Sequence, residues 1–405
     1  MLKNLIVLSD GTEISTGENA IIKTNYSSYA NSGTELTPGS VCAAMLEMKF
    51  FAPSGRISLE HGEEVQYYKV SDNGNRTLVG LFVLEKPTKS SANTYQFTAY
   101  DRISKLDRNL GLWLKNLDGW PYTMAEFAQI VCAQCGVTLI DNPDLPNGDL
   151  QIQQFYDSEI TGRKIMEWIG QLAGRFCRAT PEGEIEFAWY EDFGLHLLPD
   201  RDPYYFGGSL SFEDYQVAEI FTVRIKISDD DVGVTYPENA SADSNTYVVS
   251  GNFLLGGIAE EKLREVAQNL LQQISGASYT PCKVSCPVDY GIRAGDIFSV
   301  TDRNGKTIQG YAMSVTNKGQ KITVSCTGSA RRDSSTAVNN ESMKSMNGKI
   351  MEIRKTVEGI NVDVRQLQVS MEKTQEDITK LEISASGWSS DVSKIIQETG
   401  KYDLK

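Results

Sequence analysis

The strongest constraint on the fold is a seven-residue repeat of apolar side chains over residues 343–381. A strict heptad repeat winds helices around one another in a left-handed supercoil. At ~1.5 Å of rise per residue the helix would be about 58 Å long. The first apolar position of the heptads holds Met343, Ile350, Val357, Val364, Met371 and Ile378. The second holds Met346, Ile353, Ile360, Leu367 and Leu381, with Thr374 as its polar exception.

This apolar stripe requires partner helices, because a lone helix cannot bury it. Mostly β-branched residues at the first position, with Ile as well as Leu at the second, favour three strands over two. We therefore predict a homotrimer with the apolar side chains of the repeat as its interface. A dimer, or an amphipathic helix packed on the chain's own domain, remain the alternatives.

Most of the preceding sequence has the composition and alternation of β-strands. A chain of 405 residues is expected to hold two to four domains. We predict a mainly β protein with two β-barrel or sandwich domains, a small α/β domain and a C-terminal trimeric coiled coil. The predicted ranges are 1–105 (first β domain), 106–198 (α/β insert), 199–335 (second β domain with one helix) and 336–405 (linker and coiled coil).

Helical periodicity appears in three places. "TMAEFAQIVCAQCG" begins with Thr123 and Glu126 spaced as a capping box, and Gly136 is placed to end the helix. "TGRKIMEWIGQLAG" and "AEEKLREVAQNLLQQI" each gather apolar residues on one face. Two Asn-Gly pairs, at 73–74 and 304–305, predict hairpin turns because they accept positive φ at low cost.

The negative net charge argues against a protein that binds nucleic acid tightly. The formal net charge is −14 and the sequence pI is about 4.8, whereas binding to phosphate needs clustered Lys and Arg. Seven cysteines at low density indicate a reducing compartment without a disulfide framework. We expect no signal peptide and no membrane segment, because no apolar run is long enough.

The cysteines offer one weak candidate for a metal site. Cys132 and Cys135 form a single C-x-x-C, and Cys282 and Cys286 would have to complete a four-ligand zinc site. The first pair lies on a predicted helix and the second alternates along a predicted strand. Burial as small apolar side chains is the simpler interpretation, so we predict no metal and no cofactor.

No catalytic residues are predicted. His61 and His196 are the only histidines and lie in different predicted domains. The acidic run 229–231 lacks the spacing of a calcium loop and its closing Glu. The aromatic stretches "WLKNLDGWPY" and "DPYYFGG" could stack on sugars, but core packing or subunit contact is the preferred interpretation.

The order of these segments resembles the hub proteins of phage tail tips and baseplates, including the N-terminal region of tail-associated lysins and related prophage tail proteins. The β segment ending in "YQFTAYDRISKLDR", the insert with "GRKIMEWIGQLAGRFCRATPEGEIEF" and the later "AGDIFSVTDRNGKTIQGYAMSV" carry the resemblance. It covers about residues 40–335, and its individual motifs are loose.

The resemblance implies a function that composition alone does not. It implies a trimer that joins the hexameric tail tube to the tip, closes the channel and lets DNA pass at ejection. The implied partners are the distal tail protein, the tail tube protein, the tape measure protein and, in some members, receptor-binding proteins. DNA would only pass in transit, and an acidic channel wall would avoid holding it. The implied location is the virion tail tip, after synthesis in the host bacterial cytoplasm.

Two other functions remain open at this point. The chain could be a receptor-binding tail fibre or adhesin, which would share the coiled coil. It could also be the N-terminal part of a cell-wall-degrading tail lysin, whose catalytic domain would lie beyond Lys405. The host, its receptor and whether the tail contracts are not specified by the sequence.

Overall fold

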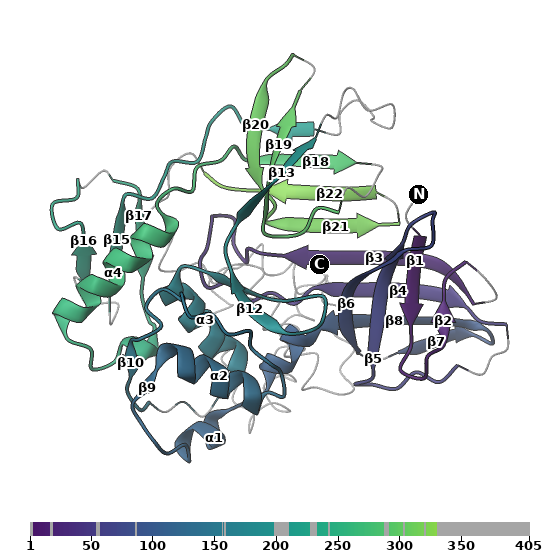
Figure 1. Ribbon diagram of the computed structural model, residues 1–405, viewed down its shortest axis with the longest axis horizontal. Coiled ribbons are helices and arrows are strands. Elements are labelled where there is room, and N and C mark those ends of the chain that lie inside the picture. Colours follow the sequence, from purple (N-terminus) through teal and green to yellow (C-terminus); the bar gives the residue numbers. More distant parts are fainter. Residues whose placement is uncertain are drawn as a thin grey trace, which may run out of the picture.

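Alternating buried and exposed residues build one large sheet of twelve strands (Figure 1). The computed structural model describes residues 3–16, 19–53, 57–85, 87–155, 157, 159–197, 210–226, 233–241, 244–286, 291–302, 304–319 and 321–329. Eleven strands follow one another in the order β14 (Leu210–Phe212), β18 (Cys282–Cys286), β22 (Lys321–Cys326), β21 (Ser314–Lys318), β3 (Ala20–Tyr29), β4 (Met45–Phe51), β8 (Thr94–Asp101), β6 (Arg76–Leu84), β5 (Glu64–Val70), β1 (Lys3–Val7) and β2 (Glu13–Ile14). β7 (Thr88–Ser91) pairs with β8 beside this row.

The sheet joins strands from the two ends of the described chain. β21 pairs antiparallel with β3, so that Ser314 lies opposite Tyr29 and Lys318 lies opposite Asn25. The sequence predicts both strands, but their pairing is not local and no pattern in the sequence specifies it. The early β segment and the late β segment are therefore halves of one continuous sheet.

One face of this sheet covers two apolar cores. In β4, Leu46, Met48 and Phe50 are buried while the residues between them are less so, as the pattern "MLEMKFF" predicts. These side chains belong to a core built by the early strands. Val284 and Val324 belong to a second core built by the late strands. The opposite face of the sheet carries most of the polar residues of these strands, together with Met45 and Phe51 of β4.

The helical region folds as its capping signals predict. The 3-10 helix η1 (Arg102–Asp107) follows β8, and Thr123 forms the predicted capping box with Glu126 at the start of α2 (Met124–Gln134). Gly174 ends α3 (Gly162–Ala173) in the left-handed conformation, with φ of 67°. The remaining elements of this region are α1 (Gly111–Lys115), β9 (Tyr122–Thr123), α2 (Met124–Gln134), β10 (Gln151–Ile152), α3 (Gly162–Ala173), β11 (Phe176–Ala179) and β12 (Ile185–Ala188).

The third predicted helix packs with the first two. α4 (Glu260–Ile274) buries Leu263, Val266, Leu270 and Ile274, the face that its periodicity predicts. It shares one core with α2 and α3. α4 also lies against a three-stranded sheet of β16 (Val234–Tyr236), β15 (Thr222–Ile225) and β17 (Thr246–Val249), at the left of Figure 1.

Two details of the late β segment differ from the sequence prediction. The apolar pattern of "TYVVSGNFLL" predicts one strand, but only its first four residues form β17, and Phe253–Leu255 form the 3-10 helix η2, because the Asn252 side chain accepts a hydrogen bond from the Leu254 N–H. β13 (Glu191–Leu197), β19 (Asp296–Thr301) and β20 (Thr307–Tyr311) form a separate three-stranded sheet. β13 runs parallel to β19, a non-local pairing that the sequence did not reveal.

No helix within the described residues is long and apolar enough to cross a membrane. The predicted coiled coil and its linker, residues 336–405, lie outside the described part of the chain.

Candidate functional site

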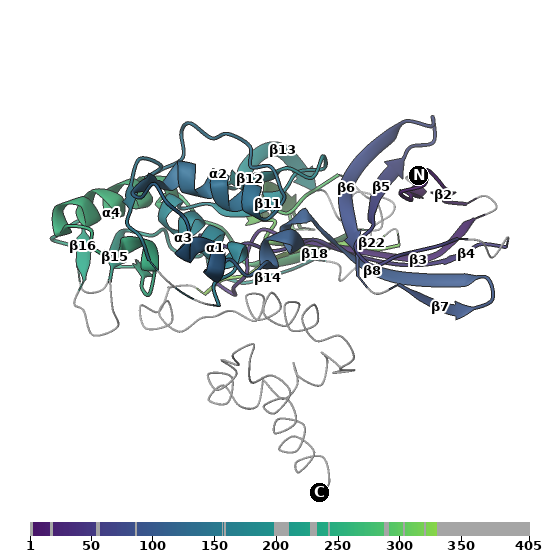
Figure 2. The ribbon, with the colours of Figure 1, turned by 90° about the horizontal axis from the view of Figure 1, so that it is seen from below.

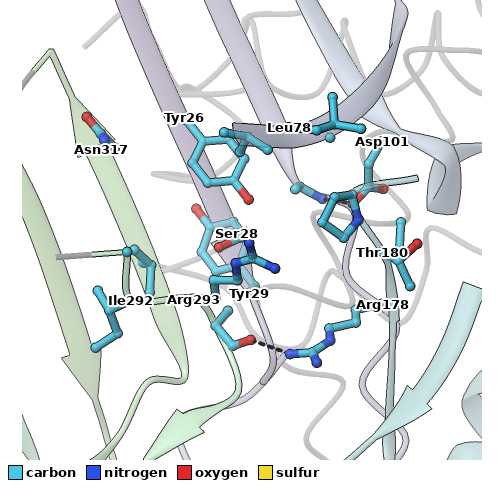
Figure 3. A pocket seen from close by; sticks show the side chains of 18 of the residues that line it. Tyr26, Ser28, Tyr29, Leu78, Asp101, Arg178, Thr180, Ile292, Arg293 and Asn317 are labelled. Atoms are coloured by element: carbon cyan, nitrogen blue, oxygen red, sulfur yellow. Dashed lines mark hydrogen bonds between the residues drawn. The ribbon is translucent and has the colours of Figure 1, made fainter. Parts of the chain in front are cut away.

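The predicted trimer interface, from Met343 to Leu381, lies outside the described residues, so the candidate site is sought in the body of the protein. A cavity of about 270 Å³ lies where the early strands, the β11–β12 hairpin and the loop before β19 meet. Figure 3 shows Tyr26, Asp101, Arg178 and Arg293 around it. Val315, Asn317 and Ile322 of β21 and β22 also line it, so segments that are distant in sequence supply its wall.

Arg178 is the polar link across this cavity. Its Nε donates to Glu186 Oε1 at 2.7 Å, across the β11–β12 hairpin. Its Nη1 donates to the Ala294 carbonyl at 2.9 Å, in the loop before β19 (Figure 3). The guanidinium also lies 5.6 Å from the centre of the Phe176 ring. About 30% of the side chain remains exposed, so Arg178 ties the hairpin to the late β segment at a partly solvated position.

Asp101 lies at the opposite wall and ends β8. Its Oδ2 accepts from the Ala44 N–H at 2.9 Å, and its Oδ1 accepts from the Ile103 N–H at 3.0 Å, which caps η1. Burial raises the pKa of this carboxyl to about 7, although the two N–H groups and Arg163 act in the other direction. The side chain is structural, since both of its oxygens are engaged by backbone groups.

A second arginine, Arg163 on α3, makes a fully buried link beside the cavity. It forms an ion pair with Asp107 through two of its nitrogens, one of which reaches Oδ2 at 3.0 Å. Its Nη1 donates to the Val41 carbonyl at 2.6 Å. Both charged side chains are 6% exposed or less. Arg163 therefore joins α3, η1 and the segment before β4 inside the protein.

A third charged group lies at the edge of the same junction. Glu64 on β5 accepts from Arg102 Nη2 at 2.8 Å and from Lys105 Nζ at 2.7 Å. The hydrogen bond from Arg102, together with Lys105, lowers the pKa of Glu64 to about 2. The early sheet is thus bound to η1 by an ion-pair network that is about one-third exposed.

The cysteines considered as metal ligands lie in two different cores. Cys132 and Cys135 are buried in the helical core, whereas Cys282 and Cys286 are buried under the late strands. Burial raises the pKa of Cys132 to about 12 and that of Cys135 to about 11. Among the described residues, no group of three or more His, Cys, Asp or Glu side chains is arranged to hold a metal ion. These thiols are packed as small apolar groups, as the sequence patterns indicated.

The two histidines do not meet. His61 is exposed in a turn, and His196 on β13 lies within hydrogen-bond distance of Ser299 and Thr301 on β19. Trp120 packs against both Tyr122 and Phe127. In the stretch 113–122 Leu114 is buried, and Trp113, Trp120 and Tyr122 are half-buried against the helical core. The acidic run 229–231 and the stretch "DPYYFGG" lie outside the described residues.

The charged links at the junction could not be found from the sequence. Arg163 and Arg178 stand among many charged residues, and neither belongs to a recognisable motif. The position of Arg163 in the first turn of a predicted helix does not distinguish a surface residue from a buried link.

Comparison with solved structures identifies the fold. The 43 kDa tail protein of prophage MuSo2 from Shewanella oneidensis has a TM-score of 0.51 with this chain at 14% identity, covering 81% of this chain and 98% of its own. A tail protein from Neisseria meningitidis MC58 has a TM-score of 0.50 at 12% identity, covering 82% and 97%. No protein-family model matches the sequence, and no curated protein matches it significantly. The resemblance to tail proteins seen in the sequence is confirmed at the level of the fold.

Proposed function

We propose that this chain is a structural protein of a phage or prophage tail, acting as a trimeric hub at the tail tip or baseplate. The observation that carries the proposal is the continuous sheet through β21 and β3, in a fold shared over nearly the whole length of a prophage tail protein. The charged links around the cavity fit this role, because they hold three segments together without an evident reacting group.

The trimer would present two β bodies from each chain, so that three chains offer six to a hexameric tail tube. We keep the predicted domain ranges as part of this proposal: β domains at 1–105 and 199–335, the α/β insert at 106–198, and the linker with the trimeric coiled coil at 336–405. The heptad residues from Met343 to Leu381 would hold the three chains together.

The hub would join the tail tube and distal tail protein to the tip, contact the tape measure protein and close the channel until DNA is ejected. Receptor-binding proteins are further partners where the tail carries them. We propose that the chain is made in the cytoplasm of the bacterial host and ends in the virion tail. Within this span its role would be structural rather than catalytic.

Subunit mass in solution tests the trimer. The full chain should have the mass of three copies by light scattering after gel filtration. A chain that ends at residue 339 should lose most of the trimer at micromolar concentration, because it lacks the heptad stripe. Replacing Ile353 and Ile360 by Asn in the full chain should act in the same direction. A full chain that is monomeric, or a truncated chain that stays trimeric, would contradict the coiled-coil assignment.

A further inference from the structure

The polar face of the large sheet carries a group of lysines, although the net charge of the chain is negative. Residues directly opposite each other on neighbouring strands share a face. The registers place Tyr29, Met45, Phe51, Thr94 and Tyr100 on the face opposite the buried residues of β4, β18 and β22, with Tyr100 covered by the helical core. Fifteen polar residues of five adjacent strands and β8 share this face. They are Lys283 and Ser285 (β18), Lys321, Thr323 and Ser325 (β22), Ser314, Thr316 and Lys318 (β21), Lys23, Asn25 and Ser27 (β3), Glu47 and Lys49 (β4), and Gln96 and Thr98 (β8).

This face holds five lysines and one carboxylate in a chain of net charge −14. Among the described residues, none of the five lysines forms an ion pair. The carboxylate, Glu47, accepts a hydrogen bond from Asn25 at 2.9 Å rather than pairing with a lysine.

The lysines are also placed against one another. Lys23 lies directly opposite Lys49, and Lys318 lies directly opposite Lys321. Like charges at directly opposite positions are unfavourable in a sheet. An anion over this face would relieve the repulsion, so the arrangement favours a negatively charged partner.

The side chains of this face favour nucleic acid over protein as the negatively charged partner. Protein–protein interfaces have apolar and aromatic centres and are depleted in Lys and Ser. The side chains between these lysines are mainly Ser, Thr, Asn and Gln, which, with Lys, donate to phosphate and sugar oxygens in nucleic-acid complexes. Figure 2 shows β22, β3 and β8 on the side of the described body opposite α4.

We infer that this face, which we call the lysine face, contacts the phosphate backbone of duplex DNA without reading its sequence. The inference rests on the proposed function, in which DNA passes through the hub, and assigns this face to the channel wall. It reverses the expectation of an acidic wall. Lysines on one face of a sheet would make exchangeable phosphate contacts, and each neutralised phosphate would add about 0.9 to the salt dependence of binding.

The test compares two triple variants of the full chain that change net charge equally. One is Lys23→Gln with Lys318→Gln and Lys321→Gln, on the lysine face. The control is Lys115→Gln with Lys262→Gln and Lys306→Gln, at the end of α1, on α4 and before β20. The probe is a short fluorescent duplex of random sequence, followed by anisotropy over a range of salt concentrations.

The full chain should bind the duplex weakly at low salt. The lysine-face variant should lose on the order of ten-fold in affinity and show a shallower salt dependence, while the control variant binds nearly as the parent does. Equal losses in the two variants, or no binding by the parent at about 10 mM salt, would overturn the inference. So would a lysine-face variant that binds DNA normally but changes subunit mass, because the face would then join protein copies.

The DNA-binding inference and the proposed hub function can fail independently of each other. If the protein proved absent from tail particles while the lysine-face variant still lost DNA binding, the phosphate-binding face would stand and only its place in a tail channel would fall. If the protein proved to be a trimeric tail hub whose lysine face was indifferent to DNA, the hub would stand and the inference would fail.

Discussion

Two arginines link the helical region to the rest of the fold, and they do so in different surroundings. Arg163 and Arg178 each pair with one carboxylate and each donate to a carbonyl of a segment distant in sequence. The Arg163 link is buried, whereas the Arg178 link is about 30% exposed and lines the cavity. The fold depends more strongly on the buried link, because water cannot reach and solvate a charge that is left unpaired inside the protein.

Arg163→Met should therefore produce the largest loss of stability. It would leave the Asp107 carboxylate and the Val41 carbonyl buried without their partner, which costs about 3–5 kcal/mol of unfolding free energy. Urea unfolding followed by circular dichroism measures the change. Adding Asp107→Leu to Arg163→Met should recover part of the loss, because the uncompensated charge is removed. No recovery would show that packing rather than charge dominates at this link.

Asp101 lies between the two links, and its titration should give the next largest effect. Its pKa is 3.8 in the unfolded reference and about 7 in the fold, so the folded chain holds the proton more tightly. The stabilisation is complete below about pH 4 and is lost as the pH rises through about 7. At about 1.4 kcal/mol per pKa unit the unfolding free energy should fall by up to about 4 kcal/mol.

Asp101→Asn isolates this dependence, since Asn does not titrate. Urea unfolding at several pH values between 4 and 8 should show a weaker slope in the variant than in the parent. An identical slope in both proteins would assign the pH dependence to other groups and would mean that Asp101 is ionised throughout.

Arg178→Met should have a smaller effect than Arg163→Met, at about 1 kcal/mol of unfolding free energy. Its carboxylate partner Glu186 is about 28% exposed and can be solvated after the substitution. Arg178→Lys is the matched control, because it keeps the charge and loses the two-pronged geometry. A loss as large as that of Arg163→Met would remove the contrast between the buried and the exposed link.

The sequence predicted the local structure well where the signals are local. The capping box at Thr123, the buried face of α4 and the alternation of β4 are each contained in a few neighbouring residues, and the structure has all three. The pairing of β21 with β3 and the parallel pairing of β13 with β19 depend on contacts between distant segments. Periodicity carries no information about such contacts.

The charged features show the same limit. Net charge is a sum over the chain, so it predicted an acidic protein and missed that Lys23, Lys49 and Lys318 share one face of the sheet. That face exists only because two distant β segments pair. Likewise, Arg163 is buried only because η1 and the segment before β4, both distant in sequence, pack against the first turn of α3.

The number of copies per tail tests the central claim most directly. Tail particles purified from a strain that carries the gene, analysed by quantitative mass spectrometry and electron cryo-microscopy, should contain three copies of this chain in a ring at the tip. Absence of the protein from the particles, or a copy number other than three at that position, would contradict the account.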